Sequence, residues 1–243
     1  MRGLAVINAV AAGARDLKAI CAHIGVARST THRLASGLVQ ERYLRTLPGV
    51  GYALGPRLIE LGFQAREAFP IAVLARPHLD ELAALTGDTI HLAVRDGDEV
   101  LYLEKIPGKK GLEMRSRVGH RMPLAATGVG KALTLDETAS QWESLYRASG
   151  PASPHAPGAR QDWAAFRERM QEYVAQGYAF DLEDNEPSIR CVAAPIRDAG
   201  RAIVAALSVS STVPYMSLAR MRELVPTVKQ AAARVSAELG GGA

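Results

Sequence analysis

The stretch ARSTTHRLASGL, residues 27–38, places two arginines, three hydroxyl residues and a histidine in the first two turns of a predicted helix. Leu34 and Leu38 recur at four-residue spacing, as apolar residues do on a helix that packs against a core. Such a helix needs one capping side chain, which Ser29 or Thr30 could supply. The other polar side chains exceed that need, so we expect them to contact a polar partner.

A second short helix is predicted directly before this stretch. Asp16 is a suitable cap for it, Gly25 is a suitable end, and an apolar stripe is formed by Leu17, Ile20, Cys21 and Ile24. Two helices joined by a tight glycine turn form a helix-turn-helix, whose second helix lays its N-terminal residues in the major groove of DNA. The pattern is weak by itself, so other features must support it.

The distribution of charge provides support. Residues 1–70 hold nine Lys or Arg residues against four acidic residues, whereas the rest of the chain holds 20 against 21. A polyanion would therefore meet the first third of the chain.

The first residues, MRGLAVINAVAAGA at 1–14, have a positive charge, a short apolar run and small residues, as a secretory signal does. Asn8 interrupts the run, and Leu4, Ile7 and Ala11 recur at helical spacing. We therefore interpret this segment as a helix that packs through these three residues. No stretch approaches the roughly 20 apolar residues that span a bilayer, and we expect a cytoplasmic protein without membrane contact.

Metal and enzyme chemistry have little support. The chain holds two cysteines and six histidines, without an HExxH or CxxC spacing, so a disulfide framework and a four-thiolate zinc site are excluded. We expect no metal, cofactor or catalytic residue. The alternative is an enzyme with Cys191 as nucleophile and His91, His120 or His155 as base, although no motif places any of them beside it.

Residues 43–55, YLRTLPGVGYALG, contain two short apolar runs around a proline and two glycines, which predicts a hairpin, or wing, behind the second helix. A connecting helix is predicted over 56–69, and Pro70 and Pro77 should break it before a further helix ends at Gly87. The remaining pattern is two strands, helices near 136–148 and 160–176, two strands and a last helix. It predicts an antiparallel sheet with helices, an α+β fold.

The closing hairpin, CVAAPIRDAGRAIVAALSVS at 191–210, carries small polar residues. If residues 198–201 form a four-residue turn without a bulge, Cys191 lies opposite Ser208. Ser210 then shares the same face of the sheet, because side chains alternate along a strand. Three small polar side chains should therefore meet on one face.

The chain resembles the IclR family of bacterial transcription regulators from end to end. The matching segments are RGLAVINAV (2–10), ARSTTHRLASGLVQERYLR (27–45), GYALGPRLIELG (51–62), TIHLAVRDGDEVLYLEKI (89–106), SRVGHRMPLAATGVGKAL (116–133) and RCVAAPIRDAGRAIVAALSVSS (190–211). The resemblance implies a winged helix-turn-helix over 1–55, a linker helix over 56–69 and a GAF-like antiparallel-sheet effector-binding domain over 70–243. It also implies a ligand-responsive regulator, most often a repressor of a catabolic operon.

With this resemblance, binding to double-stranded operator DNA is strongly favoured. Arginine offers a fork that binds guanine O6 and N7 together, and short hydroxyls suit phosphates and base edges. The candidate residues of the second helix are Arg28, Ser29, Thr30, Thr31, His32 and Arg33. In the wing, Arg45 and Tyr52 are candidates for contacts with the DNA backbone, or alternatively serve only the hairpin.

The loop ATGVGKAL at 126–133 leads glycines into a helix start, where free N–H groups favour an anion. The resemblance implies a pocket for a small organic acid, lined by Gly128, Val129, Asp181, Ile189, Cys191, Ser208 and Ser210. Alternatively, these small residues serve only tight packing. Since an ionised Asp181 would repel a carboxylate, we expect its side chain to accept from a ligand hydroxyl or a backbone N–H.

Two positions depart from the family pattern. Ser188 and Ser211 stand where relatives often have glycine, and both could reshape the pocket. The resemblance further implies a homodimer through the DNA-binding half and, in many relatives, a homotetramer through the effector domains.

Overall fold

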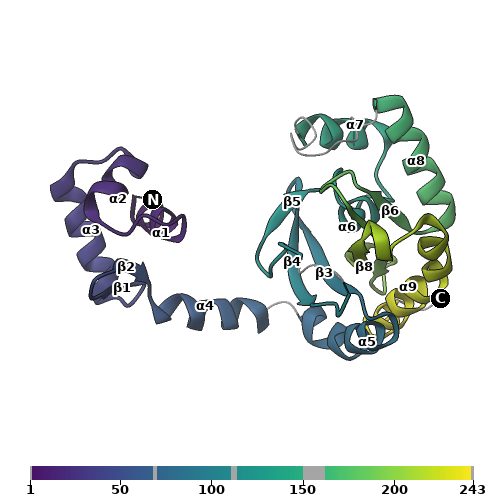
Figure 1. The fold of residues 1–243 in the computed structure, drawn as a ribbon, viewed down its shortest axis with the longest axis horizontal. Helices are drawn as coiled ribbons and strands as arrows, with labels where there is room; N and C mark the ends of the chain where they lie inside the picture. The colour runs from purple at the N-terminus through teal and green to yellow at the C-terminus, as the bar shows by residue number, and fades with distance from the viewer. Residues whose placement is uncertain (1, 68–69, 111–113, 150–161, 242–243) are drawn as a thin grey trace. The chain divides into compact units, whose positions relative to one another are not determined.

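A computed structural model describes residues 2–67, 70–110, 114–149 and 162–241. The chain forms two compact units, Met1–Phe69 and Pro70–Ala243, which we call the first and the second unit (Figure 1).

The first unit contains three helices, a two-stranded antiparallel hairpin and a fourth helix. Their bounds are α1 (Arg2–Ala11), α2 (Leu17–Ile24), α3 (Arg28–Gln40), β1 (Leu44–Leu47), β2 (Gly51–Leu54) and α4 (Pro56–Glu67). This confirms the predicted winged helix-turn-helix.

Local signals define α2 as expected. The Asp16 side chain accepts a hydrogen bond from the N–H of Ala19 at 2.8 Å, and Gly25 ends the helix in the left-handed conformation with φ 64°. Glycine adopts that conformation at no steric cost. The tight turn into α3 therefore follows from the sequence.

The helix predicted at the start of the chain is confirmed, but its predicted buried face is wrong. Val6, Ala9 and Val10 of α1 are fully buried against α2, α3 and β1, whereas Leu4 is 65% exposed. Several apolar residues here fit a helical period, so spacing alone did not identify the stripe that meets the core.

The end of α3 is tied to the start of α4. The N–H of Arg57 donates to the carbonyl of Arg42 at 3.1 Å, and the Glu60 carboxylate binds the Arg42 and Arg57 guanidinium groups at 3.0 and 2.9 Å. We call Arg42, Arg57 and Glu60 the Glu60 clamp. The hydrogen bond from Arg57 lowers the pKa of Glu60. Gly55 is required beside the clamp, because a Cβ there would lie 2.1 Å from the Arg42 carbonyl oxygen.

The second unit is built on a six-stranded antiparallel sheet with the order β5-β4-β3-β8-β7-β6. Its elements are α5 (Pro70–Thr86), β3 (Thr89–Asp96), β4 (Glu99–Ile106), β5 (Arg121–Pro123), α6 (Gly128–Leu133), α7 (Ala139–Ala148), α8 (Trp163–Gln176), β6 (Ala179–Leu182), β7 (Ile189–Arg197), β8 (Ile203–Thr212), a 3-10 turn (Val213–Tyr215) and α9 (Leu218–Glu238). Helices α5 and α9 lie side by side (Figure 1). The predicted α+β class is confirmed.

Two faces of the central strands have different partners. Along β7, Cys191 faces α6, whereas Ala194 on the other face lies beside residues of α9. The pocket described below lies on the α6 face, where Cys191, Ser208 and Ser210 lie.

The predicted break at Pro77 is wrong, because α5 runs through it from Pro70 to Thr86. A proline removes the hydrogen bond to the carbonyl four residues earlier, here that of Val73. Val73 and Pro77 both lie on the exposed side of α5, where water can satisfy that carbonyl. Exposure therefore makes the proline tolerable.

The buried face of α1 can be tested by a pair of substitutions. Val10→Ala should destabilise the first unit by about 1 to 3 kcal/mol, since it removes two buried methyl groups. Leu4→Ala, on the exposed face of the same helix, should change stability by less than about 0.5 kcal/mol. Hydrogen exchange of the α1–α3 amides in the full chain measures both. A larger cost for Leu4→Ala would restore the stripe predicted from spacing.

Candidate nucleic-acid interface and ligand pocket

The exposed side of α3 carries the polar side chains that the sequence singled out. Arg28, Ser29, His32 and Arg33 are exposed and Thr30 is half-buried. Neither Ser29 nor Thr30 caps the helix, because Ala27 is the cap residue and no side-chain bond is made there. Within the part of the chain that the structure describes, no hydrogen bond or ion pair engages the side chains of Arg28, His32 and Arg33. These groups are therefore available to a partner.

Thr31 must be removed from the predicted contact set. Its residue is fully buried, and its hydroxyl donates to the carbonyls of Val26 and Ala27 at 3.3 and 3.1 Å. Because these bonds close the turn between α2 and α3, Thr31 shapes the interface from inside and does not face a partner.

The two wing residues differ. Arg45 on β1 is exposed, as a contact residue must be. Tyr52 on β2 is half-buried against the core of the first unit, and its N–H donates to the Arg15 carbonyl at 2.7 Å. Its packing favours the alternative that Tyr52 serves the hairpin.

A cavity of about 40 Å³ lies in the second unit between the sheet and α6. The structure brings all seven residues of the predicted pocket around it: Gly128, Val129, Asp181, Ile189, Cys191, Ser208 and Ser210. Their role in ligand binding stays a prediction.

The register of the closing hairpin differs from the prediction by two residues. Cys191 lies opposite Ser210, and Ser208 lies opposite Ala193. The turn is one residue longer than expected, since Arg197 pairs with Ile203, and an irregularity between Ile196 and Arg197 adds the second residue. A shift of two leaves every side chain on its face, so the three polar residues still meet.

Sequence reasoning named His91 only as a possible enzymatic base and did not place it in the ligand pocket, where it lies on β3 opposite Ser208. Its ring contacts two serine hydroxyls, that of Ser116 at 2.8 Å from Nε2 and that of Ser210 at 3.4 Å from Nδ1. Burial lowers the pKa of His91 to about 3, so the ring is neutral, with one donor and one acceptor nitrogen. The further lining residues missed are Tyr102, Met114, Ser116, Thr127, Asn185 and Glu186. Alternation along β3 shows that His91 shares a face with Thr89, but only the β3–β8 pairing reveals which face.

Gly128 and Cys191 meet at the bottom of this pocket. A Cβ at residue 128 would lie 2.3 Å from the Cys191 Sγ, so only glycine fits there. Burial raises the pKa of the Cys191 thiol to about 12, and a nucleophile must be a thiolate. The His91 ring contacts serines instead, His120 is exposed, and His155 lies outside the described residues. The geometry therefore gives the cysteine enzyme no support.

Four charged residues form a cluster beside the pocket, of which Lys131 and Asp181 are buried and Arg169 and Asp184 half-buried. Lys131 on α6 is 1% exposed, donates to the Phe180 carbonyl at 3.2 Å and pairs with Asp184, which also binds Arg169 of α8 at 3.0 Å. Burial alone would raise the pKa of Asp184, but Lys131 and Arg169 lower it to about 2. The fourth member is Asp181.

Asp181 is the member of the cluster that lines the cavity. One carboxylate oxygen accepts from the N–H of Asp184 at 2.8 Å, which matches the expected backbone partner. Burial raises the pKa of Asp181 to about 6, against the opposing influence of Lys131. Its protonation state is therefore sensitive to a new charge nearby.

The two positions expected to depart from the family pattern are both unusual in the structure. Ser188 has φ 64°, a left-handed conformation that glycine adopts without strain. Ser211 is buried, and its hydroxyl has no hydrogen-bond partner among the described residues. Glycine would remove the strain at residue 188 and the unpaired hydroxyl at residue 211.

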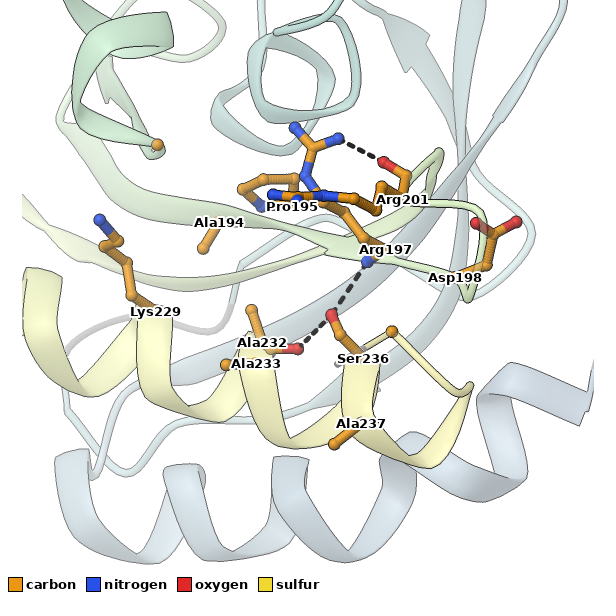
Figure 2. Close-up of a pocket in the computed structure, with 12 residues that line it drawn as sticks. Ala194, Pro195, Arg197, Asp198, Arg201, Lys229, Ala232, Ala233, Ser236 and Ala237 are labelled. Atoms are coloured by element: carbon orange, nitrogen blue, oxygen red, sulfur yellow. Dashed lines mark hydrogen bonds between the residues drawn. The ribbon is translucent and has the colours of Figure 1, made fainter. Parts of the chain in front are cut away.

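A second, larger cavity of about 280 Å³ lies between the hairpin end of β7–β8 and α9. Figure 2 shows Lys229 at one end of it and Arg197 and Arg201 at the other. Arg197 is held by Asp136 at 2.6 Å, and Lys229 donates to the Gln176 carbonyl at 2.7 Å. Two of the three cations thus have structural partners, and this groove is separate from the pocket beside α6.

Among the described residues, no cluster of His, Cys, Asp or Glu could hold a metal ion. No helix in the same residues has the length and apolar character needed to cross a membrane.

Comparisons with known proteins identify the family. The IclR helix-turn-helix domain model matches residues 1–48, and the bacterial transcriptional regulator IclR C-terminal model matches residues 63–237. The chain is 32% identical to the HTH-type transcriptional regulator XynR of Escherichia coli, over 98% of this chain and 96% of XynR. It is 28% identical to the transcriptional repressor IclR of the same organism, over 99% of this chain and 89% of the repressor.

A solved structure resembles the whole chain. It is an IclR homolog from Microbacterium hydrocarbonoxydans complexed with 4-hydroxybenzoate, with a TM-score of 0.82, 25% identity and coverage of 98% of each chain. All these matches are to regulators, so the enzyme alternative is set aside. The chain belongs to the IclR family of bacterial transcriptional regulators.

Proposed function

We propose that this regulator is a cytoplasmic repressor of a catabolic operon that binds operator DNA through α3 and the wing and releases it in response to a small organic acid. The exposed polar face of α3, unengaged within its own unit, is the observation that carries the proposal. The E. coli relative named a transcriptional repressor supports the direction of control, and the homolog that holds 4-hydroxybenzoate supports an acid as effector.

The DNA contacts are assigned to the exposed residues of the first unit. Arg28, Ser29, Thr30, His32 and Arg33 are spaced so that 28 and 32, and 29 and 33, are neighbours along one side of α3. Arginine and histidine suit base edges, and the hydroxyls and Arg45 suit phosphates.

The operator-binding form is a homodimer, because one recognition helix covers too few base pairs for useful specificity. Ile59 and Phe63, four residues apart on α4, are 64% and 62% exposed. Covering such side chains contributes about 1.5 to 3 kcal/mol each. We assign the pair to the contact with a second copy of the chain. A homotetramer through the effector domains is the larger assembly.

The effector lies in the cavity beside α6. A volume of about 40 Å³ is room for about three water-sized groups, so the ligand is small or the pocket widens around it. The hydroxyls of Ser208 and Ser210 and the free N–H groups of Gly128 and Val129 offer donors to a carboxylate.

The function is tested first at α3. The double variant His32→Ala, Arg33→Ala should lose at least tenfold in operator affinity, since a base contact contributes roughly 1 to 3 kcal/mol. Arg167→Ala, which removes one exposed positive charge from α8, is the control and should bind normally. Gel-shift titration at two salt concentrations measures both. Full operator affinity in the double variant would end the assignment of α3.

The dimer is tested by sedimentation. Ile59→Ser with Phe63→Ser should shift the chain toward monomer, since polar side chains remove the apolar contact. Val50→Ser, at an exposed apolar position in the wing turn, is the matched control and should leave the assembly unchanged. A wild-type chain that sediments as a monomer with and without operator DNA would refute the dimer.

The ligand site is tested by Ser208→Ala with Ser210→Ala. The double variant should keep its operator affinity and lose its response to a confirmed effector, because two donors to the acid are gone. Isothermal titration with that effector decides the matter. Unchanged affinity would mean that the acid binds elsewhere and that the serines only pack the sheet.

A further inference from the structure

This inference rests on the proposed function, because it concerns the charge of the pocket beside α6. Among the described residues that line the cavity there is no Lys or Arg, but there are two carboxyl groups, Asp181 and Glu186. The only imidazole, His91, is neutral. A ligand carboxylate would therefore enter a buried space in which no side chain on the wall compensates its charge.

Cations lie one layer behind the wall. Lys105 donates to the carbonyls of Met114 and Ser116, both of which line the cavity. Lys131 and Arg169 both bind Asp184, and Asp181 is the second carboxyl beside them. Two cations and two carboxylates balance only when Asp181 is ionised. An ionised Asp181 and a ligand carboxylate together would leave one negative charge in excess. The free-energy cost of that uncompensated charge is large because the site is buried.

The cluster has spare donors for a replacement anion. The Nε and Nη1 atoms of Arg169 are buried and have no partner among the described residues. Lys131 has three N–H groups and makes two recorded contacts, with Phe180 and Asp184. The cluster therefore has N–H donors that its own carboxylates do not use.

We propose that the pocket takes up one proton with each monocarboxylate ligand, that the proton goes to the carboxyl of Asp181, and that the ligand replaces Asp181 as the counter-charge to Lys131 and Arg169. The charge balances, since the ligand brings one negative charge and the solvent supplies one proton. The Asp181 carboxyl accepts from the Asp184 N–H and also interacts with the Asn185 N–H, and once protonated it donates to the ligand.

Every titratable or charged group around Asp181 is consistent with this exchange. They are Lys131 on α6, Arg169 and Tyr173 on α8, Asp184 and Glu186 after β6, Cys191 on β7, Tyr102 on β4 and His91 on β3. Burial raises the pKa values of the Cys191 thiol and the Tyr102 hydroxyl, so both stay neutral. Burial also raises the pKa of Asp181 to about 6, which makes it the group that a new anion protonates near neutral pH.

The sign of the pH dependence follows. Well above pH 6 the free pocket holds an ionised Asp181, so a proton must be taken up and affinity should fall about tenfold for each pH unit. Below that range Asp181 is already protonated and affinity should be independent of pH, as long as the ligand stays ionised.

The experiment is isothermal titration of the full chain with glycolate and with 4-hydroxybenzoate, at pH 5 and pH 7.5, in two buffers that differ in ionisation enthalpy. The dependence of the observed enthalpy on the buffer measures proton uptake, which should approach one proton at the higher pH and zero at the lower. Asp181→Asn, a neutral side chain of the same shape, should bind with no proton uptake and no pH dependence. Glu186→Gln, which neutralises the other carboxyl of the wall, should still take up close to one proton at pH 7.5, whatever its affinity, so that loss of uptake is specific to Asp181.

The outcomes separate the inference from the function. If the wild type binds without proton uptake at pH 7.5, the inference is overturned and the ligand site stands. This measurement uses the wild-type chain alone and does not depend on the folding of a variant. Proton uptake that persists in Asp181→Asn also overturns it, because the proton then goes elsewhere. If neither acid binds at either pH, both the proposal that this cavity binds small carboxylates and the inference are refuted.

Discussion

The pairing of β3 with β8 is the constraint on which the second unit depends. It joins Thr89–Ala93 to Ala206–Ser210 and is the only link, among the strands described, between the β3–β4–β5 half of the sheet and the β6–β7–β8 half. Ile90 and Leu92 on one side of that pairing are fully buried, which makes it costly to break. On its other side, the same pairing brings His91 beside Ser208. The core and the pocket are thus two faces of one contact between distant segments.

Features set by neighbouring residues could be predicted from the sequence, whereas features set by contacts between distant segments could not. The cap at Asp16, the turn at Gly25 and the wing are local, and the structure has them where the sequence predicts them. The buried face of α1 and the burial of Thr31 depend on what packs against them, which no local pattern contains. The seven pocket residues were predicted from the resemblance. In the closing hairpin, the prediction of which side chains share a face was correct, although the predicted register was not. His91 was not placed in the pocket because its neighbours come from another strand.

The pocket wall and the layer behind it carry different kinds of polar groups. Apart from the carboxyl groups of Asp181 and Glu186, the polar side chains of the wall are weak donors and neutral rings. The strong charges of Lys131, Arg169 and Asp184 lie behind it and are held by one another. Such a cluster contributes less to stability than an apolar core of the same volume would, since its members must be desolvated. Its retention beside a cavity suits recognition of an anion better than it suits packing.

The attachment of α4 at the Glu60 clamp allows a rotation of this helix to be transmitted toward α3. A helix of 12 residues is about 18 Å long, so a displacement of about 1 Å at its far end turns it by about 3°. The backbone bonds from Arg57 to Arg42 and from Gly55 to Tyr43 pass that rotation to the short segment between α3 and β1. The ion pairs of the clamp add little stiffness, because they are exposed and solvent screens them. A small rotation of α4 therefore changes the orientation of α3. In a complex with operator DNA, this rotation would tilt α3 before any of its contacts with the DNA is broken.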